Sequence, residues 1–430
     1  MFLQIFFAHP NFLLTFIAMK RIITILASCL LCACVLAQRN EILNNRISSV
    51  QVVAGTDWLS MPVINLHSSK RINISFDDLT HEYHRYIYKV EHCEADWSLS
   101  ESLFTSDYIE GFRDGISLDK LEESINTNVL YTHYKLSIPN ENCRLKISGN
   151  YRVTIYDENH GNEEILRVYF MVVEPLMGVQ LSVTPNTDIG INSSYQQVGV
   201  NVNYAGIRVP DFSRQIKTVV LQNGRWDDAR ILSKPQYVMG DGIRWEHERE
   251  LIFFGGNEYR KFEMLDVHDV GLGIESMEWD GSAYHAYLWP AEPRINYVYD
   301  EDANGSFYIR NMDNYENDRT SDYVLVHFTL KLPRQAGDVY LNGTWTNDQF
   351  TPQYKMEYDD IEECYSTVIS MKLGYYSYQY LMMTEEGNVV PLASEGNFFQ
   401  TENMYQALVY YRGLGERTDR LVGYQQVKFK

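Results

Sequence analysis

The sequence predicts an all-β protein made of tandem Ig-like or β-sandwich domains. Aromatic residues make up 13% of the 430 residues, including 32 tyrosines, and aromatic and β-branched side chains favour the half-buried surface of a strand. Short runs of these residues alternate with polar or glycine-containing turns, as where Tyr151–Tyr156 follows Ser148–Asn150. No fixed-period repeat is found, which disfavours a solenoid or a propeller.

Composition and charge exclude several classes of function. Charged residues make up 22% and hydrophobic residues 45% of the chain, which is typical of a globular protein. The formal net charge is −20, and lysine and arginine are not gathered into a stripe. Because an acidic surface repels phosphate groups, nucleic acid and anionic membranes are unfavourable partners.

The first 37 residues have the pattern of a secretory signal peptide. They contain no acidic side chain, and Lys20-Arg21 precede an apolar run that ends at Ala37, where we expect cleavage. Translation is expected to begin at Met19, which stands directly before this basic pair. An N-terminal membrane anchor is the alternative, but the apolar run is short for a membrane span. No later segment is long and apolar enough to cross a membrane.

Cysteines raise two further questions. The strings that end at Cys29 and Cys34 resemble lipoboxes, so lipidation at either residue is an alternative to simple cleavage, which we favour. Cleavage leaves Cys93, Cys143 and Cys364, and an odd number argues against a disulfide framework. The sequence does not decide whether a single Cys93–Cys143 bridge forms.

We expect three β domains after the signal peptide. Glu174-Pro175 ends a strand and marks the first boundary, because proline removes a ladder donor. The acidic, asparagine-rich segment around Asn311 marks the second. The expected domains are an N-terminal β-sandwich over 38–175, a second β domain over 176–312 and an early-Ig-like β-sandwich over 313–430.

One string resembles the opening of a calcium loop. Asp300, Asp302 and Asn304 place oxygen atoms at alternate positions, as a hard cation requires. The position that should supply a bidentate glutamate is Asn311, and no helix pattern flanks the loop. A two-residue Asn-Gly turn between strands explains the same residues, and we favour it over a metal site.

No residue set indicates catalysis, so we expect a protein that is not an enzyme and that carries no cofactor. His81 and His84 lie on a predicted strand, where an offset of three places side chains on opposite faces, and this disfavours zinc. His92 and Cys93 are adjacent and also face opposite ways. Neither a nucleophile elbow nor a phosphate-binding glycine loop is present.

Trp345 is the basis of an alternative, carbohydrate-binding function. It follows the strand-like string Gly337–Thr344, and this region resembles the early-Ig sandwich attached to starch- and glycogen-active enzymes. An exposed tryptophan is a good platform for a sugar ring. Packing of Trp345 at the edge of its own domain is the interpretation that we favour.

The N-terminal domain carries a more specific pattern. The quoted strings are Tyr88–Ser98, Tyr108–Phe112, Asn126-Thr127, Tyr131–Tyr134, Ile138–Asn140 and Ser148–Tyr151. Over about residues 40–175 the chain resembles the type IX secretion system plug proteins of Bacteroidetes, a family formerly described as a domain of unknown function.

The resemblance implies a function and a partner. It implies a periplasmic protein that binds the giant outer-membrane β-barrel translocon and closes it while no substrate is in transit. Closure and release need only a modest free-energy difference between translocon states. Trp97, Tyr108 and Phe112 are candidate interface anchors, although each could belong to the core, and for Trp97 we favour the core.

Overall fold

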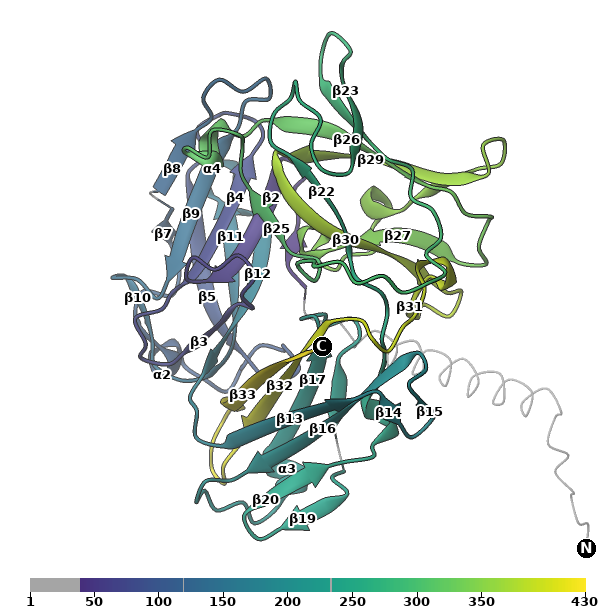
Figure 1. Cartoon of the computed structure of the whole chain (residues 1–430). Helices are drawn as coiled ribbons and strands as arrows, with labels where there is room; N and C mark the ends of the chain where they lie inside the picture. The colour runs from purple at the N-terminus through teal and green to yellow at the C-terminus, as the bar shows by residue number, and fades with distance from the viewer. Residues whose placement is uncertain (1–38, 119, 233) are drawn as a thin grey trace, which may run out of the picture. The chain divides into compact units, whose positions relative to one another are not determined.

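The computed structural model describes residues 39–430, apart from 119 and 233 (Figure 1). The expected signal peptide over 1–37, the start at Met19 and the lipidation candidates Cys29 and Cys34 lie outside the described residues. The regular structure consists mostly of strands arranged in several sheets, which confirms the all-β class. Helices are single turns: α2 (Thr105–Tyr108), α3 (Phe212–Gln215), α4 (Asn317–Thr320), and the 3-10 turns η1 (Glu158–His160), η2 (Arg249–Leu251), η3 (Thr344–Thr346), η4 (Pro352–Tyr354) and η5 (Ala393–Glu395).

The first lobe is a sandwich of two sheets around one hydrophobic core. One sheet has the order β1-β12-β11-β5-β7 with β3 paired to β12, and the other has the order β2-β4-β9-β8. Alternating side chains from both sheets, such as Phe76, Tyr86 and Tyr134, are fully buried in contact with one another. The strands are β1 (Glu41–Ile42), β2 (Ile47–Ala54), β3 (Val63–Asn65), β4 (Ile72–Asp78), β5 (Tyr86–Cys93), β6 (Ile109–Gly111), β7 (Ile116–Ser117), β8 (Lys120–Glu123), β9 (Thr132–Ile138), β10 (Cys143–Leu145), β11 (Gly149–Asp157) and β12 (Glu163–Val173).

The second lobe combines the middle of the chain with its last strands. Its two larger sheets have the orders β13-β16-β20-β19, with β21 on β16, and β18-β17-β32-β33. Val198 and Val220 share a core with Tyr405 and Val422. The strands are β13 (Gly178–Thr184), β14 (Asn186–Thr187), β15 (Gly190–Ile191), β16 (Tyr195–Asn203), β17 (Ile216–Gln222), β18 (Arg230–Leu232), β19 (Tyr237–Met239), β20 (Gly242–Trp245), β21 (Ile252–Phe254), β32 (Asn403–Tyr411) and β33 (Arg420–Phe429).

The third lobe is formed by the chain between β21 and β32. One sheet centres on β30, which pairs with β22, β25, β27 and β31, and the other has the order β23-β24-β26-β29-β28. Phe262 and Tyr376 stack in its core. The strands are β22 (Arg260–Met264), β23 (Ile274–Trp279), β24 (Tyr284–Leu288), β25 (Phe307–Ile309), β26 (Tyr323–Leu330), β27 (Asp338–Asn342), β28 (Glu357–Asp359), β29 (Cys364–Lys372), β30 (Gly374–Met383) and β31 (Val389–Pro391).

The sheet pairings divide the later part of the chain differently from the expected ranges 176–312 and 313–430. β17 pairs along its whole length with β32, so residues 216–222 and 403–411 belong to one sheet. β22 pairs with β30, so part of the expected second domain belongs to the third lobe. The third lobe is therefore inserted into the second. Local patterns show where strands occur but not which distant strand each one pairs with.

Polar and aromatic contacts join the lobes within the described residues. Asp77 of the first lobe accepts hydrogen bonds from Lys372 Nζ (2.6 Å) and Tyr323 Oη (2.7 Å) of the third. Between the first and second lobes, Trp97 contacts Trp226 edge-to-face with ring centroids 5.1 Å apart. Asp419 Oδ2 accepts a hydrogen bond from the backbone of Ala95 (3.1 Å).

Candidate functional site

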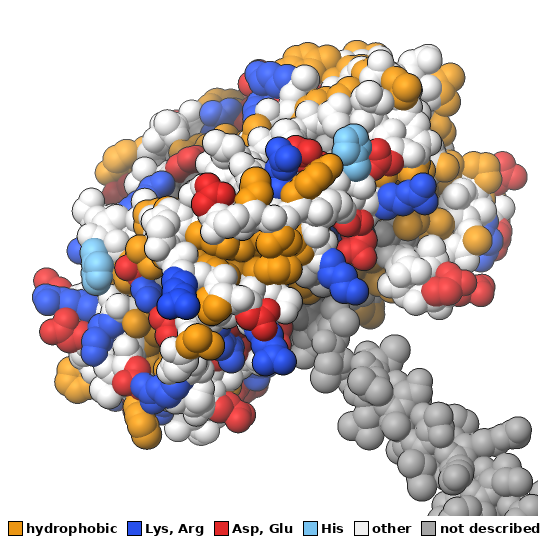
Figure 2. Space-filling view, turned by 90° about the horizontal axis from the view of Figure 1, so that it is seen from below, with side chains coloured by type: hydrophobic (Ala, Val, Ile, Leu, Met, Phe, Trp, Pro, Cys, Tyr) orange, Lys and Arg blue, Asp and Glu red, His pale blue; other side chains and the backbone are white. Residues whose placement is uncertain are grey.

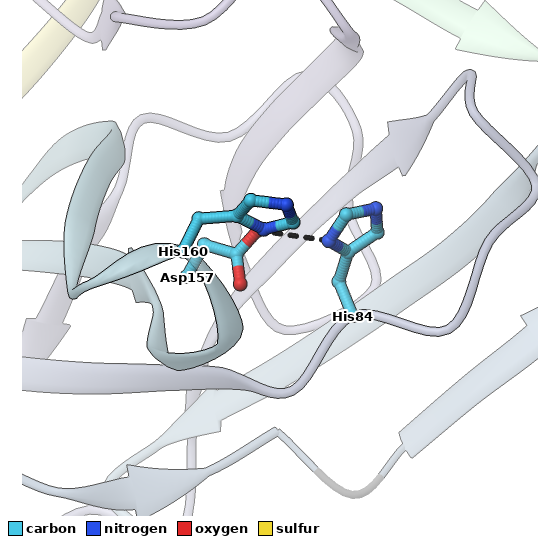
Figure 3. Close-up of side chains that lie close together, drawn as sticks. All are labelled: His84, Asp157 and His160. Atoms are coloured by element: carbon cyan, nitrogen blue, oxygen red, sulfur yellow. Dashed lines mark hydrogen bonds and ion pairs between the residues drawn. The ribbon is translucent and has the colours of Figure 1, made fainter.

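A cluster of two histidines and one aspartate lies in the first lobe (Figure 3). The turn η1 directly follows β11 and places His160 three residues after Asp157, while His84 lies just before β5. The Nδ1 atoms of His84 and His160 each lie 2.8 Å from Asp157 Oδ2. His84 and Asp157 are buried and His160 is exposed. In the described part of the chain, this is the group whose ligand-type atoms gather closely enough to hold a metal ion.

Hydrogen bonds hold the His84 ring in place. The Thr80 hydroxyl donates to Asp78 Oδ1 (2.8 Å), and its oxygen lies 3.1 Å from His84 Nε2. The other ring nitrogen, Nδ1, lies 2.8 Å from Asp157 Oδ2. His84 thus bridges Thr80 and Asp157.

The electrostatics favour a structural role for this cluster over a metal site. Zinc would require the lone pairs of both Nδ1 atoms and an oxygen of Asp157. Arg46 Nη2 lies 2.6 Å from that same Asp157 oxygen and places a positive charge beside the cation position. Burial raises the pKa of Asp157, but hydrogen bonds from His160 and His84 outweigh it and lower the pKa overall. The cluster therefore ties Arg46, before β2, to the opposite sheet.

The sequence prediction did not find this cluster. It disfavoured zinc on a His81–His84 pair, and His81 Nδ1 indeed lies apart, 3.3 Å from the carbonyl of Tyr131. The partners of His84 are 73 and 76 positions away in the sequence, at Asp157 and His160. The spacing Asp157–His160 around a single turn was the available local signal, but nothing local indicates that His84 joins it.

The predicted interface residues lie in different environments. Trp97 is half-buried and contacts Tyr169 and Trp226 where the first two lobes meet. Tyr108 is buried in the core of the first lobe. Phe112 is 66% exposed and stands directly after β6, and Phe104, which the sequence analysis did not single out, is 74% exposed just before α2.

Trp345 packs against its own lobe. Its Nε1–H donates to the carbonyl of Ser377 (3.1 Å), and its ring contacts Phe328, Tyr354 and Tyr376. The side chain is half-buried beside the core of the third lobe. These contacts favour the packing interpretation and leave Trp345 a poor sugar platform.

The calcium-like string is held in a turn by protein contacts. The Asp300 carboxylate pairs with Lys261 Nζ (2.6 Å), whereas Asp302 accepts the backbone N–H groups of Tyr259 and Asn304. Burial raises the pKa of Asp302 to about 7. Asn304 Oδ1 is buried without a hydrogen-bond partner. Asp300 and Asp302 thus serve different partners, which agrees with the turn interpretation.

All three described cysteines are free thiols. Cys93 and Cys143 are buried, and Cys364 is partly exposed. Burial raises the pKa of the Cys93 and Cys143 thiols to about 12. The Cys93–Cys143 bridge that the sequence left open is not formed in this structure.

Comparisons with known proteins identify the family. Residues 47–174 match the sequence model described as the type 9 secretion system plug protein 1st domain, and the chain belongs to this family. A solved structure of a hypothetical protein from Parabacteroides merdae is 36% identical, covers 92% of this chain and 100% of its own, and has a TM-score of 0.88. The partial N-terminal region of the enterococcal surface protein is 7% identical with a TM-score of 0.18, which is too low to carry an argument. No curated protein matches.

Family membership supports general conclusions about role, location and kind of function. It implies a role connected with type 9 secretion, a periplasmic location and a structural rather than an enzymatic function. In the residues that the structure describes, we find no helix of the length and apolar character that a membrane span requires.

Proposed function

We propose that this protein binds the giant outer-membrane translocon of type 9 secretion from the periplasm and closes it while no substrate is in transit. The observation that carries the proposal is the match of residues 47–174 to the plug family. An open secretion pore would leak solutes, so an idle translocon needs a stopper. A stopper must bind reversibly, which requires differential affinity for the idle and active states rather than chemistry.

The construction of the described chain suits this role. Residues 39–430 form one compact unit, and the buried ion pair Asp77–Lys372 and the half-buried ring contact Trp97–Trp226 join its lobes. A body in which the lobes are fixed to one another can occlude an opening without the entropic cost of ordering loops on binding.

The exposed aromatic residues of the first lobe are the surface that we assign to the translocon. Phe104 and Phe112 flank the segment that contains α2 and β6, and both lie within the range that matches the family model. Large exposed aromatic side chains commonly anchor protein interfaces.

A second hydrophobic feature lies outside the assigned surface. Figure 2 shows that hydrophobic side chains gather in a band on the face seen from below, which is the end where β19 and β20 of the second lobe lie in Figure 1.

A pull-down from the native host tests the proposal. The tagged mature chain, extracted in gentle detergent, should recover one very large outer-membrane β-barrel protein, identified by mass spectrometry and enriched when secretion is idle. Failure to recover such a barrel would contradict the proposal.

Matched variants test the assigned surface separately. Phe104→Asp combined with Phe112→Asp should reduce recovery of the barrel by at least roughly tenfold, as expected for loss of two interface anchors. Ile361→Asp is the control, since Ile361 is 89% exposed but lies in the third lobe. If both variants recover equal amounts of the barrel, the closure proposal stands, but Phe104 and Phe112 are not part of the contact surface.

A further inference from the structure

A cavity of about 370 Å³ opens in the first lobe between β3 and β10. Its apolar lining includes the buried side chains of Ile64, Leu145 and Val172. This volume falls within the range of roughly 300–1,000 Å³ that is typical of ligand pockets. The cavity is separate from the His84 cluster and from the exposed pair Phe104 and Phe112, none of which lines it.

The two strands beside the cavity offer little free backbone. Among the described residues, β3 pairs with β12 alone and β10 pairs with β6 alone. On their other edges, the Val63 N–H donates to the carbonyl of Met61, the Asn65 carbonyl accepts from the Ser68 N–H, and Cys143 exchanges two backbone hydrogen bonds with Asn140. A ligand in this cavity is therefore recognised mainly through the side chains of the lining.

Two cationic side chains of the lining lack partners. Arg71 and Arg144 are exposed, and neither guanidinium forms an ion pair or a hydrogen bond with the described residues. Other arginines of the first lobe are paired, as Arg46 is with Asp157 and Arg152 with Glu91. In a chain of net charge −20, two unpaired arginines on one cavity are a local departure from the acidic surface.

The remaining polar groups leave this charge largely uncompensated. Glu141 is the acidic residue among those lining the cavity, and His67, Asn65, Asn140, Ser68 and Ser69 supply neutral or titratable groups. Arginine binds carboxylates through two parallel hydrogen bonds, which fixes the orientation of the ligand as well as its charge.

We propose that this cavity binds a peptide segment of a partner protein that carries a carboxylate side chain next to apolar residues. The carboxylate lies against Arg71 and Arg144, and an apolar side chain enters the space above Ile64, Leu145 and Val172. The site is independent of translocon closure, so either proposal can fail alone.

Fluorescence anisotropy on the folded mature chain tests this proposal. The probe is a fluorescein-labelled peptide of sequence GSVVDVVSG, compared with the GSVVNVVSG peptide in which the carboxylate becomes an amide. We expect saturable binding of the first peptide, weakened by salt, and at least roughly tenfold weaker binding of the second, because charge-assisted hydrogen bonds are lost.

Variants of the protein complete the design. Arg71→Gln combined with Arg144→Gln should weaken binding of the acidic peptide by at least roughly tenfold. Ser69→Trp should block the cavity without altering its charge. Arg208→Gln is the control, because Arg208 is also exposed and without an ion pair but lies in the second lobe. Circular dichroism confirms that each variant is folded.

Three outcomes would overturn the proposal. They are the absence of saturable binding of the acidic peptide, equal binding of the two peptides, and an equal effect of the arginine variants and Arg208→Gln. A site for small anions would also overturn it. In that case, inorganic phosphate would displace the peptide at a concentration where phosphate itself saturates the site, and the Ser69→Trp variant would still bind the peptide.

Discussion

Asp77 and Lys372 form a fully buried ion pair, with 2.6 Å between Oδ2 and Nζ, although 295 residues separate them in the sequence. The aspartate lies on β4 of the first lobe and the lysine ends β29 of the third. Burial would raise the pKa of Asp77, but Lys372 and His133 lower it overall. The Lys372 ammonium also lies 4.0 Å from the centre of the Tyr131 ring. The pair therefore fixes the first and third lobes to each other.

Removal of either partner should destabilise the protein strongly. Lys372→Met leaves Asp77 buried without its main counter-charge, and we expect a loss of roughly 3–5 kcal/mol in the free energy of unfolding. The double variant Asp77→Asn with Lys372→Met should lose less than the sum of the two single variants. Urea unfolding measures each value. Lys355→Met, which breaks the more exposed pair with Asp338, should change stability by about 1 kcal/mol or less.

Trp97 should stabilise the contact between the first two lobes. Trp97→Ala removes the edge-to-face contacts with Trp226 and Tyr169, and we expect a loss of about 2–4 kcal/mol. Trp289→Ala is the matched control, since Trp289 is 61% exposed and its loss should cost about 0.5 kcal/mol or less. Thermal and urea unfolding compare the two. Equal effects would contradict the assignment of Trp97 to a packed contact.

His92 should make the protein less stable in mild acid. Burial lowers the pKa of His92 to about 4, so this ring stays neutral in the folded chain while it is protonated near pH 6.5 in the unfolded chain. The unfolded state then binds more protons between these values, and stability falls as pH drops from about 6.5 to about 4. Urea unfolding across this range should show a smaller fall for His92→Gln than for the parent chain. An unchanged slope would contradict the assignment.

Asp302 should make the protein less stable as the pH rises, which is the opposite of the effect of His92. Burial raises the pKa of its carboxyl group to about 7, whereas the unfolded value is near 4, so the folded state binds more protons between these values. This contribution to stability is therefore lost as pH rises from about 4 to about 7. Asp302→Asn should reduce this loss in unfolding measurements at pH 5 and pH 8. Asp300→Asn is the control, because Asp300 is exposed and paired with Lys261.

The strands were largely predictable from the sequence, because each one carries its own pattern. The run Tyr151–Tyr156 lies within β11, and the run Ser366–Lys372, which contains three β-branched residues, lies within β29. Pairing was not predictable in the same way. Nothing within 216–222 indicates that its neighbour in the sheet is 403–411, because either strand would bury its apolar face against many others.

The candidate sites show the same limit. The bond between Asp157 and His160 is local, but His84 reaches this pair only because β5 and β11 are neighbours in the sheet. Phe112 could be named from the sequence, whereas its exposure could not, since Tyr108, four residues earlier in the chain, is buried. Aromatic residues in a β protein serve cores and interfaces alike, and only the packing separates the two uses.

The return of β32 and β33 to the second lobe has a consequence for folding. The sheets and the core of this lobe cannot be completed until β32 and β33 are in place. Until then, apolar residues such as Val198 and Val220 lack the neighbours Tyr405 and Val422. An incomplete second lobe therefore exposes apolar surface that is prone to aggregation, which is the kind of surface that chaperones protect.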